Sequence, residues 1–125
     1  MHYYDSVRDI MYSNLTYNAS VEAMSDWYKF FLIPGAAHCG TNSLQPGPWP
    51  VDLVSTMIDW VENGVEPNRL NSTVSSGDYE GETQELCEWP ERPYWTSNSS
   101  FDCVYEQASI DSWTYDFPAF KLPVY

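Results

Sequence analysis

The stretch "KFFLIPGAAHCG", Lys29 to Gly40, decides how the chain is interpreted. An apolar run stops at a Pro-Gly pair, and two alanines then lead to His38 and Cys39. A short apolar run bounded in this way predicts a fully buried strand of a parallel or mixed sheet. Catalytic side chains gather in the loops after such strands, so His38 is a candidate general base. The alternative is a histidine that caps, packs or hydrogen-bonds locally.

The segments on either side of this stretch predict helices. Apolar residues recur at helical spacing through residues 2–13, and Ser20 is a candidate cap for a short helix, "VEAMSDWY". A third helix is predicted after a proline-rich loop, with Pro50 in its first position and Gly64 ending it after Asn63. Its apolar residues cover more than one face, so we expect it to be packed on two sides. A helix, a buried strand, a loop and a helix form the terminal unit of an open α/β sheet.

The sequence changes character at Arg69, where short strands are predicted. "RLNSTVSS" alternates as an exposed strand does, "GDYEGE" predicts a turn, and tryptophan and proline interrupt the remainder. We therefore expect residues 1–66 to form the end of an α/β core that carries the His38 loop. Residues 67–125 are expected to form a β-rich extension packed on that core. Neither part is complete without an upstream segment.

The chain contains three cysteines, an odd number for a protein of an oxidising compartment. Cys87 and Cys103 enclose a short loop, and we expect them to pair. Closing a loop of this length stabilises the folded state by about 3 kcal/mol in the chain-entropy model. Cys39 is left over. Its partner should lie on another polypeptide segment, unless Cys39 is a free buried thiol.

The charge balance excludes several classes of partner. The chain has eighteen acidic residues and five basic ones, which gives a net charge of -13. Such a surface repels phosphate backbones and anionic lipids, so we expect neither a nucleic-acid nor a membrane partner. No apolar run is long enough to cross a bilayer. Two histidines without a Cys-x-x-Cys motif argue against zinc, and no calcium-binding loop is present in the sequence.

Four N-x-Ser/Thr sequons, at Asn14, Asn18, Asn71 and Asn98, predict a glycosylated, secreted, extracellular protein. They lie in polar stretches that are typical of turns. The first residues are amphipathic and charged, without the apolar region of a signal peptide. We therefore expect the chain to be a mature form or a fragment of a secreted protein.

Two long stretches, "FFLIPGAAHCGTNSLQPGPWP" and "MIDWVENGVEPNRLNSTVSSG", resemble the C-terminal part of the fungal tannase and feruloyl esterase family. The most specific elements are "PGAAHCG" and "WVENG", while "TNSLQPGPWP" is more similar to the tannases of that family. The resemblance covers essentially the whole chain. It implies an α/β-hydrolase fold, of which this chain supplies the last core strand, the His loop, the packed helix and the disulfide-stapled tail. It also implies a secreted serine carboxylic ester hydrolase that releases gallic acid from gallate esters and hydrolysable tannins.

The resemblance assigns roles to two residues. His38 matches the catalytic base, and Cys39 matches the cysteine that forms a disulfide to the cysteine preceding the nucleophilic serine. The Gly-x-Cys-Ser-x-Gly motif is absent from this sequence, so the serine and the acid are expected on an upstream segment. Asp5 and Asp9 are alternatives for the acid by order, although their amphipathic helix favours a surface role.

The resemblance further implies a precursor that is cut into two disulfide-linked chains. The partner of this chain is then the N-terminal segment of the same precursor, and activity requires both. No cofactor is expected in this chain; a calcium ion would belong to an upstream lid.

Two alternative functions remain open. One is a feruloyl or chlorogenate esterase of the same family. The other is a non-catalytic extracellular module that binds glycans or polyphenols by ring stacking. The candidate stacking residues are Trp89, Tyr94, Trp95 and Trp113. The simpler interpretation of these aromatic residues is a small core beside the disulfide.

Overall fold

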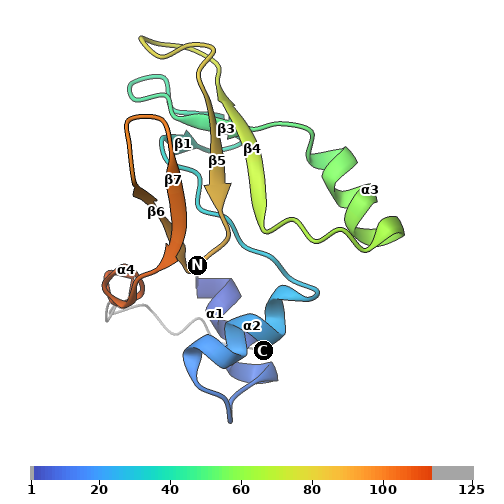
Figure 1. The fold of residues 1–125 in the computed structure, drawn as a ribbon. Helices are drawn as coiled ribbons and strands as arrows, with labels where there is room; N and C mark the ends of the chain where they lie inside the picture. Colours follow the sequence, from blue (N-terminus) through green and yellow to red (C-terminus); the bar gives the residue numbers. More distant parts are fainter. Residues whose placement is uncertain (1, 114–125) are drawn as a thin grey trace, which may run out of the picture.

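The computed structural model describes residues 2–113 as four helices and seven strands. The helices are α1 (His2–Met11), α2 (Tyr17–Ser25), α3 (Leu53–Asn63) and α4 (Gln107–Asp111). The strands are β1 (Ala36–Ala37), β2 (Gly40–Thr41), β3 (Pro48–Pro50), β4 (Arg69–Val74), β5 (Thr83–Cys87), β6 (Glu91–Trp95) and β7 (Phe101–Tyr105). They form three antiparallel sheets, β1–β2, β3–β4–β5 and β6–β7. Figure 1 shows α1 and α2 at one end of the molecule, the strands at the other, and α3 projecting from the side.

The two N-terminal helices confirm the helical periodicity of the sequence, but α2 begins earlier than predicted. Thr16 is its N-cap, and the Thr16 hydroxyl accepts a hydrogen bond from the Ala19 amide at 3.4 Å. Ser20, the predicted cap, is buried inside the helix, where its hydroxyl donates to the Tyr17 carbonyl at 2.7 Å. Both residue types can cap a helix, and local sequence does not distinguish which of them does.

The main core lies between α1, α2, α4 and the turn that follows β5. Its five buried members are Tyr4, Val21, Met24, Trp89 and Ile110. The Trp89 ring is also fixed by a hydrogen bond, because its Nε1 donates to the Tyr17 hydroxyl at 2.9 Å. Residues on both sides of position 66 therefore share one core.

The segment 29–33 departs from the prediction of a fully buried strand. It is extended and half-buried. Phe31 forms an isolated antiparallel bridge with Glu88, and the Trp89 amide donates to the Phe30 carbonyl at 2.8 Å. A core strand takes backbone hydrogen bonds from a neighbouring strand on each side. Among residues 2–113, only the chain around Glu88 supplies such bonds, so the predicted buried strand is not formed.

The start of the third helix also differs from the prediction. Pro50 is not its first residue but the last residue of β3, which pairs with β4 through Pro48–Val74 and Pro50–Ser72. β3 lies at the edge of its sheet, where a proline without an N–H is tolerated. The helix begins at Leu53 and ends at Gly64, whose φ of 68° closes it as predicted.

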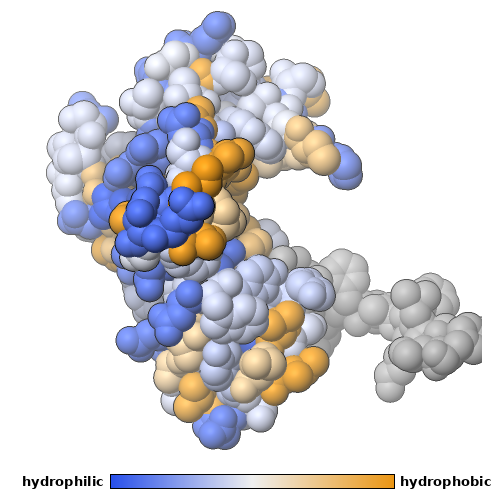
Figure 2. Space-filling view, turned by 90° about the vertical axis from the view of Figure 1, so that its right-hand side faces the viewer, coloured by the Kyte–Doolittle hydropathy of each residue, from blue (hydrophilic) through white to orange (hydrophobic). Residues whose placement is uncertain are grey.

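The expectation that α3 is packed on two sides is wrong for this chain. None of its residues is buried, and its apolar side chains are mostly exposed. Figure 2 shows hydrophobic surface next to hydrophilic surface on the side of the molecule that carries α3. A helix buries an apolar face only where another apolar surface meets it. Residues 2–113 place no such surface against α3.

The predicted β-rich character after Arg69 is confirmed as far as the end of β7 at Tyr105, whereas the short helix α4 that follows was not predicted. β4 alternates as predicted, with Leu70, Ser72 and Val74 buried and Arg69 exposed. The predicted turn "GDYEGE" joins β4 to β5, and β6–β7 forms a second hairpin. The rest of the predicted extension, residues 114–125, lies outside the described residues.

Candidate active-site hairpin

His38 and Cys39 form the tip of a very short hairpin. β1 and β2 pair through Ala36–Thr41 and Ala37–Gly40, which leaves His38 and Cys39 as the two turn residues. Both are exposed, and Cys39 adopts a φ of 57°, a left-handed conformation that is uncommon for residues other than glycine. The two side chains are therefore presented to solvent by a tight turn.

The base of this hairpin is closed by two glycines, Gly35 and Gly47. Gly35 has a φ of 66°, and its carbonyl accepts a hydrogen bond from the Asn42 amide at 2.8 Å. A Cβ on Gly35 would lie 2.5 Å from the carbonyl oxygen of Gln45. A Cβ on Gly47 would lie 2.0 Å from the carbonyl oxygen of Pro34. Only glycine fits at both positions, and this backbone contact sets where the hairpin leaves the body of the molecule.

The chain that leads into the hairpin is anchored by Lys29. Its ammonium group donates to the Ser25 hydroxyl at 2.8 Å, to Glu88 Oε2 at 2.9 Å and to Asn68 Oδ1 at 3.3 Å. The Lys29 side chain is only 3% exposed, and it also lies 5.6 Å from the centre of the Trp60 ring. One buried cation therefore contacts α2, the residue that follows β5, helix α3 and the segment between α3 and β4.

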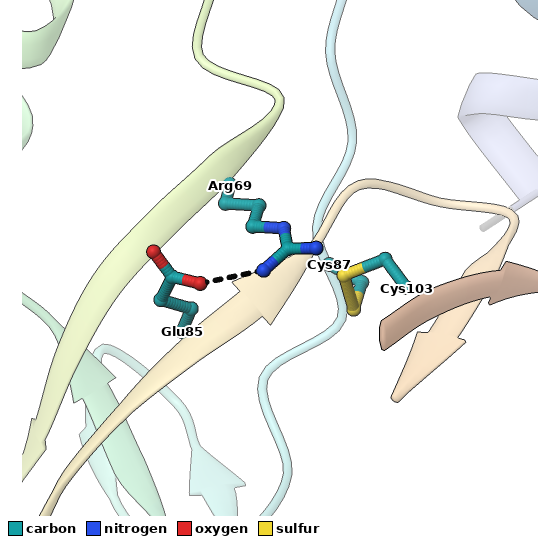
Figure 3. The surroundings of a disulfide bond; sticks show 4 residues. All are labelled: Arg69, Glu85, Cys87 and Cys103. Carbon is teal, nitrogen blue, oxygen red and sulfur yellow. Dashed lines mark hydrogen bonds and ion pairs between the residues drawn. A yellow bond between two sulfur atoms is a disulfide. The ribbon is translucent and has the colours of Figure 1, made fainter. Parts of the chain in front are cut away.

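The disulfide predicted from the sequence is present. Cys87 at the end of β5 is bonded to Cys103 in β7, with their Cα atoms 5.7 Å apart. Beside it, Arg69 donates to Glu85 across the β4–β5 pair at 2.8 Å (Figure 3). The Cys87–Cys103 disulfide joins the three-stranded sheet to the β6–β7 hairpin. Cys39 is the remaining thiol, and it is free and exposed rather than buried.

No acid is brought to His38 within residues 2–113. Asp5 and Asp9, the alternatives considered for the acid, both form ion pairs with Arg8 on α1. Asp5 also accepts a hydrogen bond from the Tyr17 hydroxyl at 3.4 Å. Neither aspartate forms an ion pair with His38, so this part of the chain holds a histidine without its orienting carboxylate.

Between residues 2 and 113, His, Cys, Asp and Glu side chains form no group of three or more that could hold a metal ion. In that range, every helix is too short or too polar to cross a bilayer.

All four sequon asparagines are exposed. Asn14 lies in the turn between α1 and α2, and Asn98 lies at the tip of the β6–β7 hairpin. Asn71 is on the exposed side of β4. Asn18 is in the first turn of α2 and not in a turn region as predicted, because the helix starts at Tyr17.

The aromatic residues considered for ring stacking lie in two different environments, the core and the surface. Trp89 is 2% exposed and belongs to the core, and Trp113 packs against that core. Tyr94 and Trp95 are 64% and 51% exposed on β6. The interpretation as a small core is therefore confirmed for Trp89, whereas Tyr94 and Trp95 remain on the surface.

Sequence reasoning missed two residues that position the hairpin, Gly47 and Lys29. Gly47 stands between two prolines in "QPGPWP", a stretch interpreted only as a loop. Lys29 is one of five basic residues in an acidic chain and directly precedes an apolar run. Both patterns are visible in the sequence, but the contacts that give them a role join residues distant along the chain.

Comparison with known proteins places this hairpin in a family. The family model described as "Tannase and feruloyl esterase" matches residues 1–110. Tannase from Aspergillus oryzae is 66% identical over 125 residues, which are 100% of this chain and 21% of that protein. A probable feruloyl esterase from Arthroderma benhamiae is 32% identical over 88 residues, covering 65% of this chain and 16% of that protein.

A solved structure agrees with these sequence matches. Tannin acyl hydrolase from Aspergillus niger superposes with a TM-score of 0.86 at 54% identity, over 99% of this chain and 23% of that one. The chain thus spans about a fifth of the length of the curated relatives it matches. By sequence and by structure, this chain belongs to the tannase and feruloyl esterase family.

Proposed function

We propose that this chain is the C-terminal segment of a secreted tannase, a serine carboxylic ester hydrolase with an α/β-hydrolase fold, and that it supplies the catalytic histidine. The observation that carries the proposal is the 66% identity to A. oryzae tannase over the full 125 residues. The exposed position of His38 on a tight turn supports the role, because a general base must reach a group on another segment.

In this proposal His38 works on a serine of the upstream segment. The imidazole takes the proton of the serine hydroxyl as its oxygen attacks the ester carbonyl, and then returns that proton to the leaving alcohol. His38 next takes a proton from a water molecule, whose oxygen attacks the acyl carbon, and then gives that proton to the serine oxygen as the acyl–serine bond breaks and the aromatic acid is released. A carboxylate of the upstream segment orients the imidazole, and backbone N–H groups of that segment stabilise the oxyanion.

Cys39 is assigned a disulfide to the cysteine that precedes this serine. Its thiol is free and exposed directly beside His38, so a partner segment can reach it. A bond between the neighbours of base and nucleophile limits how far the two catalytic groups can separate, and small displacements there lower the rate strongly. Secretion into an oxidising compartment allows the bond to persist.

The remaining assignments concern the surface and the cofactors. The exposed Asn14, Asn18, Asn71 and Asn98 are proposed N-glycosylation sites, which treatment with an endoglycosidase followed by peptide mass mapping tests site by site. We assign no cofactor to residues of this chain, and a calcium ion would belong to the upstream lid.

The test uses a chimera in which this chain replaces the matching region of A. oryzae tannase, hereafter the chimera. We expect the chimera to release gallic acid from methyl gallate, and His38→Ala to lower kcat by about 10⁴-fold or more. His2→Ala, at the other histidine of the sequence, is the control and should leave kcat unchanged. The proposal fails if His38→Ala retains the activity of the parent chimera, or if the 125-residue chain hydrolyses methyl gallate alone.

A second function, feruloyl or chlorogenate ester hydrolysis, has one observation in its favour. The family includes the feruloyl esterase relative with 32% identity. The higher identity to tannase favours gallate esters. Comparing kcat/KM for methyl gallate and methyl ferulate in the protein assembled from this chain and its own upstream segment separates the two, and faster turnover of the ferulate would select the second function.

A further inference from the structure

The tip of the β6–β7 hairpin combines an aromatic pair with a sequon. Trp95 is the last residue of β6 and lies opposite Phe101, the first residue of β7. The centres of the two rings are 5.1 Å apart. Asn98, the acceptor of the sequon at residues 98–100, is the third residue after Trp95 and is exposed in the turn between the strands. The turn therefore places an indole ring close along the chain to an asparagine that can carry a glycan.

Hydrogen bonds close this turn and hold the backbone around Asn98. The amides of Thr96 and Ser97 donate to the Ser100 carbonyl at 2.9 Å and 3.2 Å. The Ser97 hydroxyl in turn accepts from the Ser99 amide at 3.2 Å and from the Ser100 amide at 3.1 Å. The backbone on both sides of Asn98 is thus held in one conformation, so the Asn98 side chain leaves the turn at a defined place.

Asn98 and Trp95 line the same groove, which lies between the hairpin tip and the β4–β5 turn. Figure 1 shows these two turns at the same end of the molecule. The groove has a volume of about 500 Å³, within the range of roughly 300–1,000 Å³ that is typical of small-molecule sites. Its other lining residues are Val74, Gly81, Glu82, Thr83, Gln84, Ser99 and Phe101. Polar side chains therefore surround one aromatic pair, of which Trp95 is 51% exposed.

The chemistry of this groove suits a sugar ring. The face of an indole carries partial negative charge and the C–H groups of a pyranose carry partial positive charge, so the two rings attract each other when stacked. The Thr83 hydroxyl and the Gln84 amide can hydrogen-bond to sugar hydroxyls. A free sugar loses translational freedom on binding, and one stacking contact does not offset that loss. A sugar linked to Asn98 has already lost this freedom, so the glycan of the chain itself is the favoured occupant.

We propose that the first N-acetylglucosamine linked to Asn98 stacks on the exposed face of Trp95 and stabilises the β6–β7 hairpin. This inference rests on the N-glycosylation of Asn98 that belongs to the proposed function. The sugar covers indole surface that water otherwise contacts, and it joins the end of β6 to the tip of the turn. The two groups are held together only while the hairpin is formed, so the contact favours the folded hairpin.

The experiment measures hydrogen exchange in the protein assembled from this chain and its own upstream segment, secreted with its glycans. Asn98→Gln removes the acceptor, and we expect the amides of β6 and β7 to exchange roughly fivefold faster, because the hairpin then opens more readily. Asn14→Gln, at the sequon between α1 and α2, is the matched control and should leave these rates unchanged. Trimming with an endoglycosidase that leaves the first sugar in place should also leave them unchanged.

A double-mutant cycle separates the stacking contact from other effects. Trp95→Ala also removes the contact with Phe101, so it raises the exchange rates by itself. In the Trp95→Ala protein, however, Asn98→Gln should cause no further increase, since the ring that holds the sugar is gone. Trp95→Phe keeps an aromatic face and should retain most of the effect of the glycan.

Several results would overturn the inference. One is that Asn98→Gln changes the exchange rates by the same factor with and without Trp95, and another is that peptide mass mapping finds no glycan on Asn98. A third is that Trp95→Ala lowers kcat/KM for tannic acid while Asn98→Gln leaves the hairpin rates unchanged, because the groove then holds substrate. Methyl gallate turnover is measured in the same preparations. Its absence in the parent protein would contradict the proposed tannase activity without affecting the glycan contact, so the two fail separately.

Discussion

Gly35 and Gly47 meet backbone to backbone at the base of the hairpin that carries His38. A Cβ built on Gly35 would lie 2.6 Å from the amide nitrogen of Gly47 and 3.0 Å from its Cα. Side-chain rearrangement does not relieve such a clash, since both partners are backbone. The position of the proposed catalytic base therefore depends on glycine, which has no Cβ, at both positions 35 and 47.

The first prediction concerns Gly47→Ala in the chimera. The added Cβ would meet the Pro34 carbonyl at 2.0 Å, so the hairpin must move. A shift of about 1 Å in a catalytic group lowers kcat by about 10²-fold, while KM for methyl gallate should change little. Gly40→Ala in β2 is the matched control, because its Cβ would meet nothing within 4 Å. Equal kcat values for the two variants would contradict the positioning role.

The second prediction concerns Lys29→Met, which removes a cation that is 3% exposed and paired with Glu88 at 2.9 Å. The carboxylate of Glu88, itself 13% exposed, would be left without this partner. We expect the free energy of unfolding to fall by about 3 kcal/mol in urea titrations. Arg69→Met, which breaks the pair with Glu85 between side chains 41% and 46% exposed, should cost roughly 1 kcal/mol or less. Similar losses for both variants would rule out Lys29 as a buried anchor.

The third prediction separates the structural disulfide from the free thiol. Replacing both Cys87 and Cys103 with serine opens a loop whose ends are 16 residues apart. The free energy of unfolding should decrease by about 3 kcal/mol, measured by urea denaturation without reductant. Cys39→Ser should change the stability of the isolated chain by roughly 0.5 kcal/mol or less, because the thiol is exposed and unpaired. A large loss for Cys39→Ser would instead indicate a structural role in this chain.

The fourth prediction concerns pH and Glu91. Desolvation raises the pKa of Glu91, the Glu88 carboxylate raises it further, and Arg69 partly opposes this shift. The folded state thus binds the proton of Glu91 more tightly than the unfolded state does. Glu91 therefore lowers the free energy of unfolding as pH rises above the ordinary glutamate pKa of about 4.3. Glu91→Gln should flatten this decrease.

The size of the Glu91 effect is limited because its side chain reaches solvent. We expect Glu91→Gln to raise the stability at pH 7 by about 0.5 kcal/mol at most. Thermal melts at pH 4 and pH 7 measure the difference. A variant that is less stable than the parent at pH 7 would show that Glu91 makes a favourable ion pair there.

Several elements could be predicted from the sequence because their causes are local. The helical spacing of residues 2–11, the glycine that ends α3 and the alternation of β4 each depend on residues a few positions apart. The Cys87–Cys103 bond was predictable because the two cysteines enclose a short loop. The start of α2 was predicted wrongly, since serine and threonine both cap helices and serine is the more favoured type, whereas Thr16 is the cap in the structure.

The sequence alone determined that His38 and Cys39 adjoin each other after an apolar run, and its motifs predicted the family that the comparisons confirm. Only the tertiary structure decided that the pair forms a hairpin tip on a Gly35–Gly47 contact, and that Lys29 anchors the approach to it. It also decided that α3 exposes its apolar side instead of burying it. The physical reason is range: periodicity and capping act between neighbours along the chain, whereas close backbone contacts, buried ion pairs and the covering of an apolar face depend on segments that only folding brings together.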